Sequence, residues 1–260
     1  MRSVKSFDGT GLALCDEGPS HGRPVLLAHS LGATYAIWDE IAAGLVDKGF
    51  RVLRADGRGH GASDAPEGPY SVEDIGRDLI ALLDAAAAPK AHIVGLSMGG
   101  MAAMWLAVHA PERVDRLVLA NTTAFIPVKD RWDQMIAQSR QQGMAPIAEP
   151  TILSWLSPGF RERNPARTAA LVATMRAMPP HGYAGCCAIL RDVDLRGSLG
   201  SIAAPTLVVN GKDDERGAAA SAALTAGIAG ARRVDIPDAA HLSPTENPRA
   251  LLSALLKHFE

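Results

Sequence analysis

A serine at position 97 stands in a pattern that could make it a nucleophile. The segment "HIVGLSMGGMAA" (residues 92–103) begins as a buried strand and continues as a helix, and Ser97 lies between the two within the pattern G-x-S-x-G. A serine at such a tight strand-to-helix turn has strained backbone angles, and its hydroxyl is exposed above the end of the strand. The backbone N–H groups that follow can hold negative charge developing on a carbonyl oxygen. The pattern therefore predicts acyl transfer by Ser97.

A serine hydroxyl needs a base to take its proton, and the base needs a carboxylate that orients it. For a nucleophile on this kind of turn, the partners follow along the chain in the order serine, acid, histidine. Asp213, Asp214 and Glu215 come directly after an apolar strand, and His241 lies in a loop before the last helix. This order predicts His241 as the base and leaves the adjacent Asp213 and Asp214 open as the acid.

Two backbone N–H groups are expected to hold the oxyanion of an acyl-transfer intermediate. One belongs to Met98, directly after the nucleophile, and the other comes from the loop after an earlier strand. The segment "LLAHSLGATY" contains that loop and supplies the N–H of Leu31. His29 and Ser30 lie at the same edge of the predicted sheet, so we expect both side chains at the wall of the substrate pocket.

The elements that would position these residues alternate between strand and helix. Short apolar runs bounded by Gly, Pro or Asp recur along the chain, as expected for strands that are buried on both faces. Segments with helical spacing separate them, as in 71–86, where Ser71 and Asp74 have the spacing of a capping box. The alternation predicts a mostly parallel sheet with helices on both faces. The predicted strands are residues 23–29, 50–56, 91–97, 115–121, 204–211 and 232–237.

Two regions depart from this alternation. The segment "SVKSFDGTGLALCDEG" has an Asp-Gly turn between two extended pieces, so we expect a hairpin at one edge of the sheet, which makes eight strands in all. Residues 124–195 contain seven prolines together with helical pieces. They predict a helical cap over the carboxyl edge of the sheet, where ligands bind in such folds. We expect residues 1–123 and 196–260 to form the core and residues 124–195 to form the cap.

The composition argues against several other classes of protein. A net charge of −2 gives no reason to expect a nucleic acid or an acidic membrane as partner. No apolar run reaches the roughly 18 residues of a membrane helix, and the first residues lack the apolar part of a signal peptide. Three cysteines are too few for a disulfide framework and favour a reducing, cytoplasmic location. Neither CxxC nor HExxH occurs, so we expect no metal site.

Together these residues resemble the α/β-hydrolase superfamily over nearly the whole chain. The matching segments are "HSLG", "DGRGHGASDAPEGPYS", "GLSMGG", "GKDD" and the late "AAH". The resemblance implies the α/β-hydrolase fold. In that family the acid is the aspartate of a G-x-x-D pattern after a strand, which implies Asp214 rather than Asp213.

Finer motifs resemble the 3-oxoadipate enol-lactonases within that superfamily. They are "RGHGASDAPEGPYSVEDIGRDL", "GLSMGGM", "LANTTA", a cap tryptophan followed by "RQQGM", and "GYAGCCAILRDVDLR". The resemblance implies the opening of an enol-lactone in aromatic catabolism, without a cofactor.

One position departs from that resemblance. The family often has an arginine three residues after the cap tryptophan, where it could pair with a substrate carboxylate, but in this chain Met135 follows Trp132 at that distance. A methionine cannot pair with a carboxylate. Either another cation such as Arg131 or Arg140 substitutes for it, or the substrate is a less charged ester or lactone.

We therefore expect a serine hydrolase that opens a small enol-lactone through an acyl-serine intermediate, with Trp132, Met135 and Trp155 at the pocket wall. A carboxylesterase or lactonase of general type, a carbon–carbon bond hydrolase and a perhydrolase would use the same side chains. Dehalogenases and epoxide hydrolases are disfavoured, because they have an aspartate where Ser97 stands. A small-molecule receptor without turnover is the alternative from another class, and an intact set of nucleophile, acid and base argues against it. The sequence gives no indication of the oligomeric state.

Overall fold

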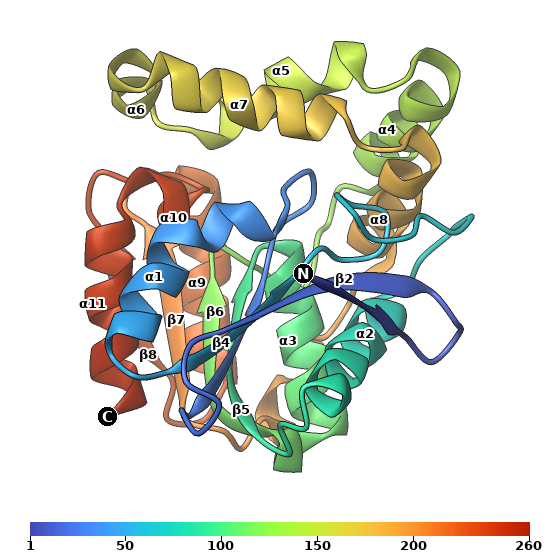
Figure 1. Cartoon of the computed structure of the whole chain (residues 1–260). Helices are drawn as coiled ribbons and strands as arrows, with labels where there is room; N and C mark the ends of the chain where they lie inside the picture. Colours follow the sequence, from blue (N-terminus) through green and yellow to red (C-terminus); the bar gives the residue numbers. More distant parts are fainter.

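The computed structural model describes all 260 residues and contains one eight-stranded sheet with helices on both sides (Figure 1). The strand order is β1-β2-β4-β3-β5-β6-β7-β8, and all pairs from β4 to β8 in this order are parallel. The hairpin of β1 and β2 lies at one edge, and β2 also pairs antiparallel with β4. The predicted fold class is therefore confirmed. The strands are β1 (Arg2–Lys5), β2 (Gly11–Glu17), β3 (Pro24–Ala28), β4 (Arg51–Ala55), β5 (Ala91–Leu96), β6 (Val114–Ala120), β7 (Thr206–Gly211) and β8 (Arg232–Ile236).

The helices of the core lie on both faces of the sheet. Helices α1 (Asp39–Asp47) and α11 (Pro248–Phe259) pack against each other on one face, and α2 (Val72–Ala85) and α3 (Met98–His109) pack against each other on the other face (Figure 1). Helix α2 begins with the expected capping box, in which Ser71 and Asp74 exchange hydrogen bonds. The remaining elements of the core are α9 (Glu215–Gly227), α10 (Ser243–Glu246) and the 3₁₀ turns Tyr35–Trp38, Pro111–Arg113 and Arg196–Ser201. No helix has both the length and the apolar character needed to cross a membrane.

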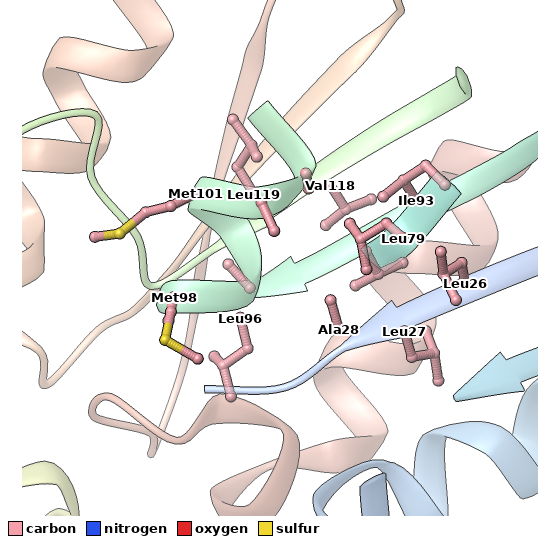
Figure 2. Packing of buried hydrophobic residues seen from close by; sticks show 14 of the residues in the cluster. Leu26, Leu27, Ala28, Leu79, Ile93, Leu96, Met98, Met101, Val118 and Leu119 are labelled. Carbon is pink, nitrogen blue, oxygen red and sulfur yellow. The ribbon is translucent and has the colours of Figure 1, made fainter. Parts of the chain in front are cut away.

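The core is built from the central strands and the helix that follows β5. Side chains of β3, β5 and β6 such as Leu26, Ile93 and Val118 are fully buried, because the strands lie between two layers of helices (Figure 2). Met101, on α3, belongs to the same buried cluster, and its side chain points away from Ile93 and Leu26 (Figure 2). Helix α3 is buried around most of its circumference, which holds its first turn firmly against the sheet.

A buried ion pair fixes the loop after β4. The guanidinium of Arg58 donates to both carboxylate oxygens of Asp78 on α2 at 2.7 Å, and a further N–H donates to Asp8 at 2.9 Å. Burial opposes the charge on Arg58, but its bonds to the two aspartates outweigh this and raise its pKa. Burial of Asp78 raises the pKa of its carboxyl group, although Arg58 works in the opposite direction. The ion pair therefore attaches the loop after β4 to helix α2.

Five helices are inserted between β6 and β7. Helices α5, α6 and α7 lie above the carboxyl end of the sheet, and α4 and α8 lie together at one side (Figure 1). We propose that this segment is the cap expected for residues 124–195, and the β-bridge between Phe125 and Asp194, which brings its two ends together, supports these boundaries. The helices are α4 (Lys129–Gln142), α5 (Ala145–Trp155), α6 (Pro158–Arg163), α7 (Pro165–Arg176) and α8 (Pro180–Asp192).

Candidate active site

Ser97 occupies a strained turn between β5 and α3. Its backbone has φ 54° and ψ −113°, a conformation that residues other than glycine rarely adopt. The neighbouring glycines make the turn possible because a Cβ atom at Gly95 would lie 2.3 Å from the carbonyl oxygen of Gly99, and one at Gly99 would lie 2.3 Å from that of Ala28. The G-x-S-x-G pattern thus lets the helix approach the strands closely and keeps the Ser97 hydroxyl above the sheet.

The structure brings Ser97, Asp214 and His241 together, although they are far apart along the chain. Nε2 of His241 lies 3.0 Å from Oγ of Ser97, and Nδ1 of the same ring lies 2.9 Å from Oδ2 of Asp214. Both distances fall in the range of hydrogen bonds. The carboxylate fixes the tautomer in which Nδ1 carries the proton, so Nε2 is free to accept the proton of the serine.

Asp214 is the buried member of the two adjacent aspartates, and Asp213 is exposed. Burial of Asp214 opposes its ionisation, but the hydrogen bond and electrostatic attraction of His241, together with bonds from Asn121 and Gly217, outweigh this and lower the pKa of Asp214 below its usual value. The Gly217 N–H donates to Oδ1 of Asp214 at 3.2 Å, so the carboxylate also caps the start of α9. Asp214, the aspartate that the family resemblance implied, is thus the one within hydrogen-bond distance of the His241 ring.

The loop that follows β3 carries Leu31. The Leu31 N–H donates to no backbone carbonyl. Met98 is the first residue of α3, so its N–H has no partner within the helix either. The next residue, Gly32, donates its N–H to Nε2 of His60 at 3.0 Å. Burial lowers the pKa of His60 to about 3, with a further contribution from His29. His60 is therefore neutral and acts as a permanent acceptor that fixes this loop.

A cavity of about 480 Å³ lies between the cap and the carboxyl end of the sheet, and it reaches Ser97 and His241. Trp132, Met135 and Trp155 line this cavity. His29 and Ser30 do not line it. The buried His29 ring bonds the Ser30 carbonyl at 2.8 Å and accepts the Gly57 N–H at 2.9 Å, and the Ser30 side chain is fully buried.

Two cations, Arg131 and Arg216, line the same cavity. Arg216 donates to the Ser154 carbonyl at 2.5 Å, whereas the guanidinium of Arg131 has no hydrogen bond or ion pair and lies 5.7 Å from the centre of the Trp132 ring. Arg140 does not line the cavity, and it lies 4.0 Å from Glu67 at the surface. Arg131 is thus the cavity cation that is free to bind an anion.

Sequence reasoning missed several residues of this site. Asn121, at the end of β6, donates to Asp214, and the segment after it contributes Thr122, Phe125 and Ile126 to the cavity wall. Tyr183 on α8 also lines the cavity. A signal for Asn121 was present, since a polar residue directly follows a buried strand at the carboxyl edge of the sheet. The structure contains no group of three or more His, Cys, Asp or Glu side chains placed to hold a metal ion.

Comparisons with known proteins give one consistent family. A family model described as the alpha/beta hydrolase fold matches residues 23–248. The 3-oxoadipate enol-lactonase 2 of Acinetobacter baylyi is 36% identical over 241 residues, which cover 91% of this chain and 90% of that protein. The structure of the enol-lactonase from Burkholderia xenovorans LB400 has a TM-score of 0.95 at 33% identity and covers 99% of each chain. A hydrolase from Pseudomonas aeruginosa PA01 has a TM-score of 0.95 at 40% identity, covering 99% of this chain and 97% of the other. These similarities confirm the resemblance found in the sequence, and the chain belongs to the α/β-hydrolase fold family.

Proposed function

We propose that this protein is a serine hydrolase that opens a small enol-lactone through an acyl-serine intermediate. The observation that carries the proposal is the chain of hydrogen bonds from Ser97 through His241 to Asp214 at the floor of a cavity beneath the cap. The similarity to two enol-lactonases over almost the full chain supports the choice of substrate class.

In the first half of the proposed reaction, His241 takes the proton of Ser97 as its oxygen attacks the lactone carbonyl. The N–H groups of Leu31 and Met98 stabilise the oxyanion, and Asp214 stabilises the imidazolium. When the intermediate collapses, the ring C–O bond breaks and the enol oxygen takes the proton from His241. The enol remains attached to the acyl-serine and becomes a ketone. Because an enolate is a good leaving group, this half of the reaction needs little additional acid catalysis.

In the second half, water cleaves the acyl-serine. His241 takes a proton from the water as it attacks the ester carbonyl, and then returns a proton to Oγ of Ser97 as the C–O bond of the ester breaks. The product leaves with a new carboxylate. The proton transfers to and from Ser97 and the attacking water pass through Nε2 of His241. The enol becomes a ketone by losing its O–H proton to water and taking a proton from water at the neighbouring carbon.

The walls of the cavity fit a small molecule that is partly apolar and carries one anionic group. Trp132, Met135 and Trp155 supply an apolar surface, and Arg131 is the free cation. A guanidinium can hold a carboxylate with two parallel hydrogen bonds. We infer that Arg131 takes the part that an arginine three residues after the cap tryptophan plays in the family. The apolar Met135 at that position is the observation that favours a second candidate, a lactonase or esterase for uncharged substrates.

Turnover of p-nitrophenyl acetate by the wild type and by Ser97→Ala tests the hydrolase proposal. We expect the substitution to lower kcat by about 10³-fold or more, because the nucleophile is removed while binding is kept. The matched control is Ser154→Ala, whose side chain bonds only within the cap. Mass spectrometry of a quenched reaction should find the acyl group on the peptide that contains Ser97. Equal, negligible rates in wild type and variant would instead favour a receptor.

A panel of matched lactones, with and without a free carboxylate, tests the substrate class. We expect enol-lactones with the carboxylate to give a kcat/KM at least tenfold above that of their methyl esters. Equal values for the two forms would reject the 3-oxoadipate type and favour an esterase or lactonase for uncharged substrates.

A further inference from the structure

The C-terminal end of cap helix α5 lies directly on the loop that carries His241. The last carbonyl groups of a helix have no partners within it and must be satisfied from outside. Here the carbonyl of Trp155 accepts the backbone N–H of His241 at 2.9 Å, and that of Ser154 accepts Arg216, two residues after Asp214, at 2.5 Å. The last carbonyl groups of cap helix α5 are therefore bound by two donors of the core, the N–H of His241 and the side chain of Arg216, which lies two residues after Asp214.

Glu246, at the end of α10, binds both sides of this junction. Its Oε2 accepts the N–H of Ser157 in the cap at 2.8 Å. Its Oε1 accepts the N–H groups of Ala240 at 2.9 Å and of Leu242 at 3.3 Å, on either side of His241 in the chain. One half-buried carboxylate thus joins the cap to the histidine loop.

These contacts leave the backbone of the histidine loop little freedom. Three consecutive N–H groups, those of residues 240–242, are bound to Glu246 or to the carbonyl of Trp155. The Trp155 ring also lies 5.6 Å from the His241 ring and lines the substrate cavity. The position of Nε2 relative to Ser97 therefore depends on where the end of α5 lies.

We propose that Glu246 is a positioning residue that couples the cap to the general base, a role that rests on the proposed function of His241. The carboxylate holds the histidine loop against Ser157, so that His241 reaches hydrogen-bond distance of Ser97 only while the end of α5 is docked. Misplacement of a reacting group by about 1 Å can cost about 10²-fold in rate. Glu246 touches neither Ser97 nor the cavity, so its effect passes through His241.

Three substitutions separate the links of this junction. In Glu246→Gln the amide can keep one oxygen for Ala240 and Leu242, but its NH₂ group does not accept the Ser157 N–H. Glu246→Ala removes all three bonds. Ser157→Pro removes the cap N–H from the other side, and the φ of −62° and ψ of 145° at Ser157 suit a proline. The matched control Ser157→Ala keeps that N–H, and Glu162→Gln changes an exposed cap carboxylate without a partner.

We expect Glu246→Gln and Ser157→Pro each to lower kcat by about tenfold, and Glu246→Ala by about a hundredfold, with KM changed by less than about threefold. The double variant Glu246→Gln/Ser157→Pro should match either single variant, because both substitutions remove the same bond. Ser157→Ala and Glu162→Gln should stay within about twofold of the wild type. A purely structural Glu246 would lower the melting temperature and leave kcat and KM unchanged, and that result would overturn the proposal.

Amide hydrogen exchange provides a readout that needs no turnover. We expect Ser157→Pro, a change in the cap, to speed exchange in the peptide that contains residues 240–242, and Ser157→Ala to leave it at the wild-type rate. Unchanged exchange there in Ser157→Pro means that the cap and the loop are uncoupled, and the proposal is then wrong. If the exchange responds but Ser97→Ala keeps full activity, the coupling stands as geometry, whereas the proposed function and the positioning role fail.

Discussion

Nδ2 of Asn121 lies 3.1 Å from Oδ2 of Asp214, the same carboxylate oxygen that binds the imidazole of His241. The hydroxyl of Ser243 donates to Oδ1 of Asn121 at 2.8 Å, which fixes the orientation of the amide. Nδ2 also donates to the Ala240 carbonyl at 3.1 Å. Asn121 has a φ of 45° and is buried, so a strained residue at the end of β6 holds both the acid and the loop of the base.

Removing the side-chain amide of Asn121 should make the Asp214 carboxylate less effective in stabilising His241. We expect Asn121→Ala to lower kcat/KM by about tenfold and to raise the pKa of Asp214, because one donor to its carboxylate is lost. Asn121→Asp should have a larger effect, since a second carboxylate beside Asp214 disfavours its ionisation further. In pH profiles of kcat/KM, the loss relative to the wild type should grow as the pH is lowered, and more so in Asn121→Asp than in Asn121→Ala, because a protonated Asp214 stabilises the imidazolium of His241 less well. Superimposable profiles would show that the amide does not act through the acid.

Arg131 should determine the preference for an anionic substrate. Arg131→Met should raise KM about tenfold for a lactone with a free carboxylate, since a charge-assisted hydrogen bond is worth roughly 1.5–3 kcal/mol. The uncharged methyl ester should be affected less than twofold. The matched control is Arg140→Met, which alters a cap cation outside the cavity. An equal loss for both substrates would mean that Arg131 shapes the cavity and does not bind the carboxylate.

His60 should make the protein less stable in mild acid. The folded-state pKa is lowered from 6.5 to about 3, so both states are neutral above about pH 6.5, and His60 adds no pH dependence there. Between these values the unfolded chain binds a proton that the folded chain does not. The free energy of unfolding should therefore fall as the pH falls, by up to about 1.4 kcal/mol per pH unit.

Urea unfolding of the wild type and of His60→Gln at pH 7, 6 and 5 measures this effect. The variant should lose less stability between pH 7 and pH 5 than the wild type does, while His21→Gln, at an exposed position, should follow the wild type. Parallel curves for wild type and His60→Gln would contradict a neutral, buried His60.

Removing only one partner of the ion pair between Arg58 and Asp78 should lower the free energy of unfolding strongly. Arg58→Met leaves a buried carboxylate without its partner, which should cost about 3–5 kcal/mol of unfolding free energy. The double variant Arg58→Met/Asp78→Leu should recover part of that loss. The exposed pair of Arg77 and Glu73 serves as the comparison, where Arg77→Met should cost less than about 1 kcal/mol. Urea unfolding at pH 7 measures all four proteins, and equal losses at the two pairs would refute a role for burial.

The sheet and the three proposed triad residues could be predicted because each leaves a local pattern. Each predicted strand run contains or closely overlaps an observed strand, since apolar runs ended by Gly, Pro or Asp mark strands that are buried on both faces. Ser97 is marked by its glycines, which the tight turn requires. The order of serine, acid and histidine then narrows the partners, whereas the choice of Asp214 over Asp213 needed the family resemblance.

Other parts of the site depend on contacts between distant segments. Helix α8 lacks a solvent-facing polar stripe from Gly182 to Leu190, because every residue of this stretch is buried. We expected His29 at the pocket wall from its place at the sheet edge, but its ring turns inward to bind Gly57 in the next loop. The roles of Asn121 and Glu246 appear only when β6, the cap and the histidine loop are assembled.

The positive φ at Ser97 lowers the thermal stability of the protein at the residue proposed as its nucleophile. A conformation of this kind costs of the order of 1–3 kcal/mol for a residue with a side chain, and glycine relieves most of it. Ser97→Gly should therefore melt at a higher temperature than the wild type while lacking the nucleophile. Directed evolution that rewards thermal survival alone would enrich inactive glycine variants, so any such campaign has to score turnover in every round.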